Sequence, residues 1–153
     1  LTMGMLEFSL EIPSQPEQLM KLSEDYENLS KYLPDQLKSV KILEKNENKT
    51  KTEEVIVFRT IVKKEIIQQA LHTKIGSNKL VTEITSGPAK GTIINSIFEK
   101  SGVGSKVNFN VDLKLELKAK IIQPLLKKYY KMVLTSVLYK MNNEILETQS
   151  TQK

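Results

Sequence analysis

The residues from 106 to 117 alternate between apolar and polar side chains, and this pattern constrains the fold more than any other in the sequence. The apolar parity is Val107, Phe109, Val111, Leu113 and Leu115, and the polar parity is Asn108, Asn110, Asp112 and Lys114. Successive side chains of a β-strand point to opposite faces, so the alternation predicts a strand that is buried on one side only. A second layer has to cover that buried side.

The C-terminal part of the chain is the best candidate for the covering layer. From about residue 120 to residue 147 there is no glycine, and the one proline, Pro124, falls in the first turn, where it is tolerated. This predicts a helix of roughly 40 Å at a rise of about 1.5 Å per residue. Its apolar stripe consists of Ile121, Ile122, Leu125, Leu126, Tyr129, Met132, Val133, Ser136 and Val137.

The preceding part of the chain predicts one strand, one or two short helices, and then about six strands in succession. The first strand is expected at Met5–Ile12, and Ser14 and Glu17 are expected to cap a helix that starts near Pro16. A second short helix should end at Pro34. The later strands are expected at residues 40–44, 52–62, 65–75, 80–85, 92–100 and 106–117.

The last hairpin can be predicted residue by residue. A turn at residues 101–104 pairs Phe98 with Val107 and Ser96 with Phe109, and by the same register Ile94 faces Val111. The buried face of the last strand therefore continues onto the strand before it.

The segment from residue 65 to residue 75 is compatible with either a helix or a strand. The hairpin is the better interpretation, because a four-residue turn at 76–79 pairs Leu71 with Ile84 and Ile75 with Leu80. In that register His72 points away from the side of Leu71 and hence outward. We therefore interpret His72 as a surface or structural histidine rather than a catalytic one.

Together these elements predict an α+β fold, in which a curved antiparallel sheet of about seven strands wraps around the long C-terminal helix. Short turns between successive strands favour a meander, and we expect one domain over residues 5–147. A twisted sheet around one helix is hard to fill with side chains, so a pocket is expected between them.

Two motifs carry a resemblance to a known family. Residues 25–34 (DYENLSKYLP) are similar to the family's acidic residue, aromatic and leucine-proline ending before the second strand, and residues 87–92 (GPAKGT) are similar to its glycine-proline turn before strand six. With the order of elements, they resemble the START-like (SRPBCC) superfamily, the helix-grip fold, in its polyketide cyclase/dehydrase and coenzyme Q-binding branch. The family usually has tryptophan or more aromatic residues in strand six, whereas this chain has no tryptophan.

The resemblance implies binding, and also transfer, of a small hydrophobic ligand such as a lipid, quinone or polyketide-like molecule. The alternative is a polyketide cyclase/dehydratase-like enzyme that acts on an aromatic or polyketide substrate. The pocket is expected to be lined by Phe58, Leu71, Ile84, Phe98, Phe109, Val111, Ile122, Leu125, Tyr129, Met132, Val133 and Ser136. Tyr129 is interpreted as core or as a ligand contact, and no catalytic residue is assigned.

The amino-acid composition argues against several kinds of binding site. The chain has no cysteine and one histidine, which argues against a metal site, and no cofactor is expected. Only one of its 23 basic residues is arginine, so nucleic-acid binding is not expected. From the sequence we expect neither a transmembrane helix nor a secretory signal, and we expect a cytoplasmic protein. A basic outer helix face, made of Lys120, Lys127, Lys128 and Lys131, is either a solubilising surface or a contact for a membrane or an acidic protein.

Overall fold

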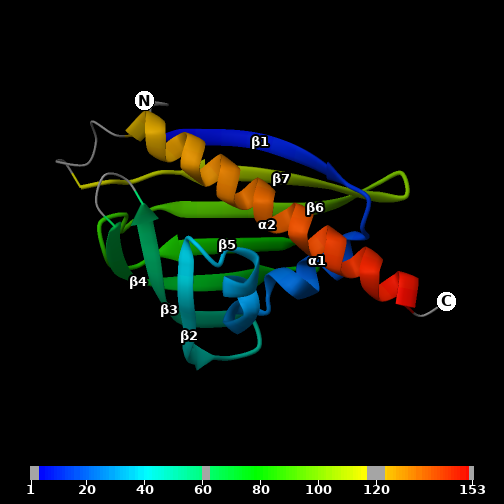
Figure 1. Ribbon diagram of the computed structural model, residues 1–153, viewed down its shortest axis with the longest axis horizontal. Coiled ribbons are helices and arrows are strands. Elements are labelled where there is room, and N and C mark those ends of the chain that lie inside the picture. The colour runs from blue at the N-terminus through cyan, green and yellow to red at the C-terminus, as the bar shows by residue number, and fades with distance from the viewer. Residues whose placement is uncertain (1–3, 60–62, 117–122, 152–153) are drawn as a thin grey trace.

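Seven antiparallel strands form one curved sheet, and a long helix lies across its concave side (Figure 1). The computed structural model describes residues 4–59, 63–116 and 123–151. The elements in chain order are β1 (Met5–Ile12), α1 (Pro16–Ser23), the 3-10 helix η1 (Tyr26–Tyr32), β2 (Leu37–Lys45), β3 (Lys49–Arg59), β4 (Lys63–Ile75), β5 (Lys79–Ile84), β6 (Ile93–Ser101), β7 (Gly104–Asp112) and α2 (Gln123–Thr151).

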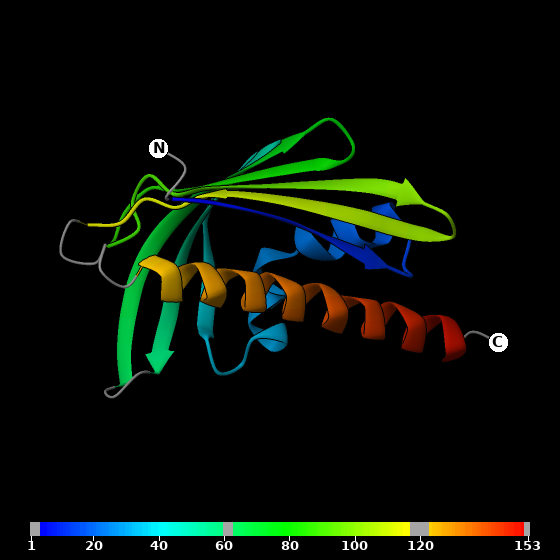
Figure 2. The ribbon, with the colours of Figure 1, turned by 90° about the horizontal axis from the view of Figure 1, so that it is seen from above.

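The order of strands across the sheet is β1-β7-β6-β5-β4-β3-β2. Strands β2 to β7 form a meander, and β1 joins its far edge by pairing with β7. Figure 2 shows that β3 and β4 bend around the beginning of α2, so the sheet surrounds the helix on more than one side. The predicted α+β helix-grip architecture is therefore confirmed.

The predicted register of the last hairpin is confirmed. Phe98 pairs with Val107, Ser96 with Phe109 and Ile94 with Val111. The connection is a two-residue turn, because Ser101 already pairs with Gly104. Gly102 has φ +57°, a conformation that favours glycine and that a tight hairpin turn requires.

The predicted register of the β4–β5 hairpin is wrong by one residue. Ile75 pairs with Lys79, so the loop has three residues, and Gly76 turns the chain with φ +61°. Ala70, not Leu71, is the residue opposite Ile84. A shift of one residue exchanges the two faces of a strand, and His72 therefore points inward and is 5% exposed.

The predicted cap of α1 is also wrong. The helix begins after Gln15, with no side-chain hydrogen bond at its N-terminus. Ser14 instead lies buried, and its hydroxyl donates to Oδ1 of Asn142 in α2 at 2.6 Å. Its carbonyl accepts a 2.5 Å hydrogen bond from Ser105 of β7. Ser14 thus ties the β1–α1 loop to both the sheet and α2.

The two halves of α2 have different surroundings. The C-terminal half contributes Leu138, Met141 and Ile145 to the packed core, and each of the three is at most 7% exposed. The other core members come from β1, α1, η1, β5, β6 and β7, and they are Ile12, Leu19, Met20, Tyr32, Leu80, Phe98, Val107 and Phe109. In the N-terminal half, by contrast, Leu125 is 61% and Met132 is 53% exposed.

A polar clamp holds η1 against α2. The hydroxyl of Tyr32 donates to Oε2 of Glu144 at 2.5 Å, and Lys31 forms a 2.7 Å ion pair with Oε1 of the same carboxylate. Lys140 donates to the carbonyl of Tyr32 at 2.8 Å. Hydrogen bonds from Lys31 and Tyr32 hold the pKa of the Glu144 carboxyl below its usual value. The clamp therefore fixes the C-terminal half of α2 against η1.

Candidate ligand cavity

A cavity of about 1180 Å³ lies between the sheet and the N-terminal half of α2. The sheet contributes apolar side chains from β2 to β7, η1 contributes Leu29, and Leu33 follows directly after η1. The helix α2 contributes a row of side chains on its inner side, from Leu125 to Met141. The volume is slightly above the range of roughly 300–1,000 Å³ that is typical of pockets for small molecules, and the wall is mostly apolar.

The structure brings eight of the twelve predicted lining residues together around this cavity. They are Phe58, Ile84, Phe98, Phe109, Leu125, Tyr129, Met132 and Val133. The ring centroids of Phe58 and Tyr129 lie 5.2 Å apart, so β3 and α2 approach each other at one end. Burial raises the pKa of the Tyr129 hydroxyl. That these residues contact a ligand remains a prediction.

Three predicted residues do not line the cavity. Leu71 faces the opposite side of the sheet, which follows from the corrected register of β4. Val111 is buried at 1% exposure within the sheet, and Ser136 is half-buried. Ile122, with the expected helix start at residues 120–122, lies outside the described residues.

A cluster of polar side chains interrupts the apolar wall, and it is centred on His72. The Nδ1 atom of His72 is 2.7 Å from the hydroxyl of Thr82, and its Nε2 atom is 2.9 Å from the hydroxyl of Thr52. The same Nε2 is 3.4 Å from Oε2 of Glu54. Adjacent antiparallel strands β3, β4 and β5 place these groups side by side, because Thr82 pairs directly with His72.

Glu54 is the acidic member of this polar cluster, and its side chain is only 13% exposed. Gln68 donates to Oε1 at 3.0 Å, and the hydroxyl of Thr52 donates to Oε2 at 3.0 Å. Burial raises the pKa of the Glu54 carboxyl, but the hydrogen bond and charge of His72, with the bonds from Gln68 and Thr52, outweigh it and leave the pKa below its usual value. A carboxylate anion is therefore held in the wall of an apolar cavity.

Tyr130 of α2 extends the polar cluster from the other side of the cavity. Burial, the charge of Glu54 and the neighbouring Tyr129 raise the pKa of its hydroxyl to about 12. The phenol is therefore a proton donor throughout the neutral range, and it lies within the electrostatic influence of the Glu54 carboxylate. Both Glu54 and Tyr130 line the cavity.

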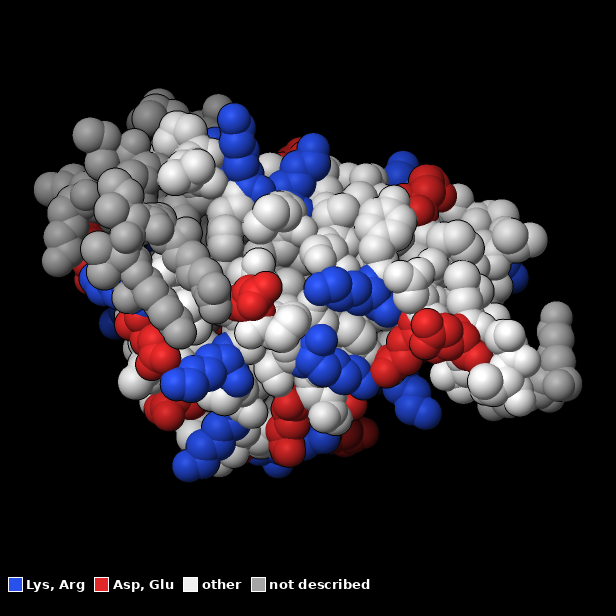
Figure 3. All heavy atoms as spheres, viewed as in Figure 1, with Lys and Arg blue, Asp and Glu red and all other residues white. Residues whose placement is uncertain are grey.

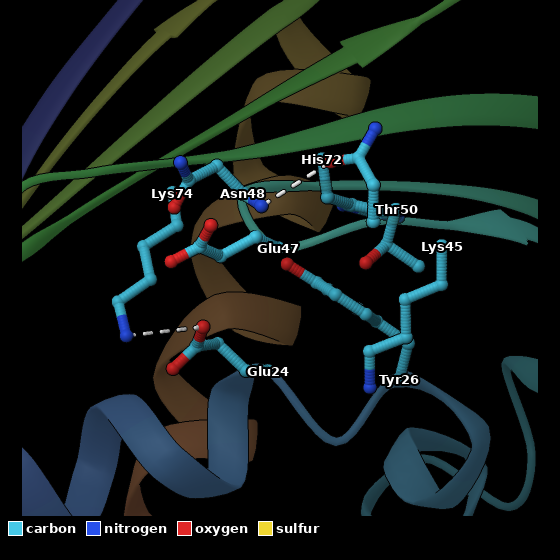
Figure 4. Close-up of a pocket in the computed structure, with 9 residues that line it drawn as sticks. Glu24, Tyr26, Lys45, Glu47, Asn48, Thr50, His72 and Lys74 are labelled. Carbon is cyan, nitrogen blue, oxygen red and sulfur yellow. Dashed lines mark hydrogen bonds and ion pairs between the residues drawn. The ribbon is translucent and has the colours of Figure 1, made fainter.

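Tyr26 of η1 closes the polar cluster against the outside. Its ring stacks on His72 with the centroids 4.0 Å apart. On the far side of this pair is a small polar pocket of about 50 Å³, which Glu24, Lys45, Asn48 and Lys74 help to line (Figure 4). An ion pair of 3.6 Å joins Lys74 to Glu24 there. Tyr26 and His72 line both spaces and therefore form a partition between them.

The sequence pattern does not predict the polar cluster as part of the site. The residues that it misses are Glu54, Gln68, His72, Thr82 and Tyr130. The signal that could have found them is the strand register. Once His72 and Gln68 are placed on the inward parity of β4, their partners on β3 and β5 are polar as well, and an inward row of polar side chains in a half-buried sheet has to be hydrogen-bonded.

The lysines at the start of α2 that the structure describes have different surroundings. The side chain of Lys131 lies over the ring of Phe8 with its Nζ 5.7 Å from the centroid, whereas Lys128 lines the mouth of the cavity. Lys120 lies outside the described residues. Figure 3 shows positive and negative side chains interspersed among uncharged ones on the α2 side of the molecule.

Within residues 4–59, 63–116 and 123–151, no group of histidine and acidic side chains could hold a metal ion. In the same part of the chain, no helix is long and apolar enough to cross a membrane.

Comparison with known proteins places the chain in a family. The model of the family described as Polyketide cyclase / dehydrase and lipid transport matches residues 12–142. This match confirms the predicted resemblance to the polyketide cyclase branch of the START-like superfamily. No curated protein sequence matches the chain.

Solved structures share the fold at low sequence identity. TTHA0849 from Thermus thermophilus superimposes with a TM-score of 0.79 at 18% identity, over 94% of this chain and 98% of that one. The Zhui aromatase/cyclase from Streptomyces sp. R1128 gives a TM-score of 0.79 at 8% identity, over 92% and 94% of the two chains. A START superfamily protein from Mycobacterium smegmatis gives 0.76 at 12% identity, over 91% and 97%.

Proposed function

The chain belongs to the Polyketide cyclase / dehydrase and lipid transport family, and we propose that it binds a small hydrophobic molecule in the cavity beneath α2. The observation that carries this proposal is the cavity itself, which has a volume of about 1180 Å³ and a mostly apolar wall. Protein interiors are normally filled with side chains at close packing, so an apolar space of this size supports the binding of an apolar guest molecule. Lipid, quinone and polyketide-like molecules all have suitable chemistry.

The test is to purify the protein under native conditions and to search by mass spectrometry for a bound apolar molecule, followed by titration with quinones and fatty alcohols. A matched pair of variants links binding to the cavity. Ser96→Phe on β6 introduces a ring into the cavity, whereas Asn95→Phe introduces the same ring on the opposite face of the strand.

We expect Ser96→Phe to weaken ligand binding by at least about tenfold, because the new ring occupies space that a ligand needs, and Asn95→Phe to bind as the wild type does. No binding of any apolar compound at micromolar concentration by the wild type would contradict the proposal. Equal binding by the two variants would place the ligand elsewhere.

A cyclase/dehydratase-like enzyme is the second candidate, and the polar cluster favours it. Glu54 and His72 form an acid–base pair 3.4 Å apart in the wall of the cavity, and Tyr129 adds a hydroxyl. The test is incubation with a poly-β-keto thioester, with detection of a product that has lost water. Full turnover in both His72→Ala and Tyr129→Phe would remove these residues from the reaction.

We also propose that the start of α2 contacts a membrane surface or an acidic protein when the ligand is exchanged. Leu125, Met132 and Lys128 support this, because they line the cavity and are exposed at its mouth. Sedimentation with vesicles of anionic and of zwitterionic lipid, at low and high salt, tests the membrane contact. The cytoplasmic location remains a prediction.

A further inference from the structure

We propose that Glu54 and Tyr130 select ligands that carry a hydroxyl group on an apolar body, and that this site disfavours ligands with a free carboxylate. The inference rests on the proposed function, because it assigns a polar recognition point to the same cavity. It names the chemical class of the ligand, which is an alcohol or a phenol rather than a fatty acid or a pure hydrocarbon.

Glu54 supplies the hydrogen-bond acceptor. A carboxylate can accept about four hydrogen bonds. Those from Gln68 and Thr52 account for two, and His72 approaches Oε2 at 3.4 Å. These partners fix the orientation of the carboxylate, which lines the cavity. A donor on a ligand can therefore bond to an acceptor that is already oriented, and a hydrogen bond to a charged group is stronger than one between neutral groups.

Tyr130 supplies a donor from the opposite wall. Its phenol lines the cavity from α2, whereas Glu54 lines it from strand β3 of the sheet. A hydroxyl group is both donor and acceptor, so it can donate to Glu54 while it accepts from Tyr130. An ether can only accept, and a hydrocarbon can do neither.

The same geometry opposes a carboxylate ligand. An anion placed next to Glu54 would meet a like charge on a side chain that is only 13% exposed, where Coulomb repulsion is less screened than in solution. His72 is already engaged by Thr82 and Thr52, so its ring nitrogens are not directed at an incoming anion. Fatty acids should therefore be poor ligands unless Glu54 is neutralised.

Three probes of nearly equal shape test this selectivity, namely 2-naphthol, 2-methoxynaphthalene and 2-naphthoate, with affinities measured by isothermal titration calorimetry at pH 7. The variant is Glu54→Gln, which keeps the size of the side chain and removes its charge. The control is Glu53→Gln, which makes the same change on the other face of β3.

For the wild type we expect 2-naphthol to bind at least about tenfold more tightly than either other probe, since a bond to a charged acceptor is worth roughly that factor or more. Glu54→Gln should weaken 2-naphthol about tenfold and strengthen 2-naphthoate, a gain that misfolding could not produce. Glu53→Gln should leave the order unchanged.

The outcomes separate this inference from the proposed function. If all three probes bind the wild type with similar affinity, the cavity binds apolar molecules but the hydroxyl selectivity is refuted. A wild type that prefers 2-naphthoate, or a Glu54→Gln variant with the wild-type order, also refutes it. If no naphthalene probe binds but a quinone or a fatty alcohol does, this inference is refuted and the proposed function stands; if no apolar compound binds at all, both are overturned.

Discussion

The same substitution at two positions of α2 should have very different effects on stability. Leu138 is 3% exposed and belongs to the packed core, although it also lines part of the cavity, whereas Leu125 lines the cavity and is 61% exposed. We expect Leu138→Ala to lower the free energy of unfolding by about 3 kcal/mol, because both the lost transfer energy and a new void contribute at a packed site. Leu125→Ala should cost less than about 1 kcal/mol, because only about two-fifths of the side chain is withdrawn from water and no new void forms.

Urea denaturation followed by circular dichroism measures both losses, and the ligand should first be removed because it would stabilise the folded state. At about 2–4 °C per kcal/mol for a chain of this size, Leu138→Ala should lower the melting temperature by roughly 6–12 °C and Leu125→Ala by only a few degrees. Both variants share the helix and the residue types, so helix propensity cancels. Equal losses at the two positions would refute the description of α2 as packed at one end and open at the other.

Four further substitutions, two of them compared with each other, test individual contacts. The pKa of Glu144 is lowered in the folded protein, so its stabilising effect is present above its ordinary pKa of 4.5 and is lost as the pH falls below that value. The Glu144→Gln variant should therefore have a lower melting temperature than the wild type at pH 7, and the difference between the two melting temperatures should shrink as the pH falls toward about 3. A difference that stays constant with pH would show that the charge of Glu144 is not its cause. Thr82→Val should lower the free energy of unfolding by about 1–3 kcal/mol in urea, because it leaves the Nδ1 atom of His72 without its hydrogen-bond partner. Gly104→Ala should destabilise the protein more than Gly102→Ala in the same assay. A Cβ at residue 104 would collide with the backbone of Ile12, whereas one at residue 102 meets no atom within 4 Å, so that substitution costs only the unfavourable φ. The reverse order would contradict the packing of β1 against this hairpin.

The parts of the fold that the sequence predicts correctly are those with a strong local pattern. The β6–β7 hairpin has an unbroken alternation on one strand and a glycine in its turn, and the pairing of Phe98 with Val107 follows from them. The β4–β5 hairpin has no such guide, because β4 places Gln68 and His72 inward and Ile67 outward at 63% exposure. The hydrophobic pattern of β4 therefore predicts the wrong inward face, and the register predicted from that face is wrong by one residue.

The site was predictable only where it is apolar. The lining residues Phe109 and Tyr129 could be predicted from the alternation of a strand and the stripe of a helix. Which half of α2 packs and which half covers a cavity depends on where α1 and η1 dock, and no local pattern contains that information. Local sequence also fails to predict the role of Ser14, because its hydroxyl donates a hydrogen bond to Asn142, a residue 128 positions away in the chain.

The hydrophobic pattern of β4 predicts the wrong inward face, and the residues that actually point inward are polar. These polar residues are the strongest argument that the cavity recognises polar groups of a ligand as well as its apolar surface. A buried carboxylate costs stability even when it is hydrogen-bonded, and apolar side chains of similar volume could fill the same wall at less cost. Here three strands position Thr52, Glu54, His72 and Thr82 in one connected network with Tyr26 stacked against it. A local departure from the otherwise apolar wall is expected where a chain gives up stability for function. This network is therefore the feature that supports the proposed selectivity, and we expect that selectivity to depend on Glu54.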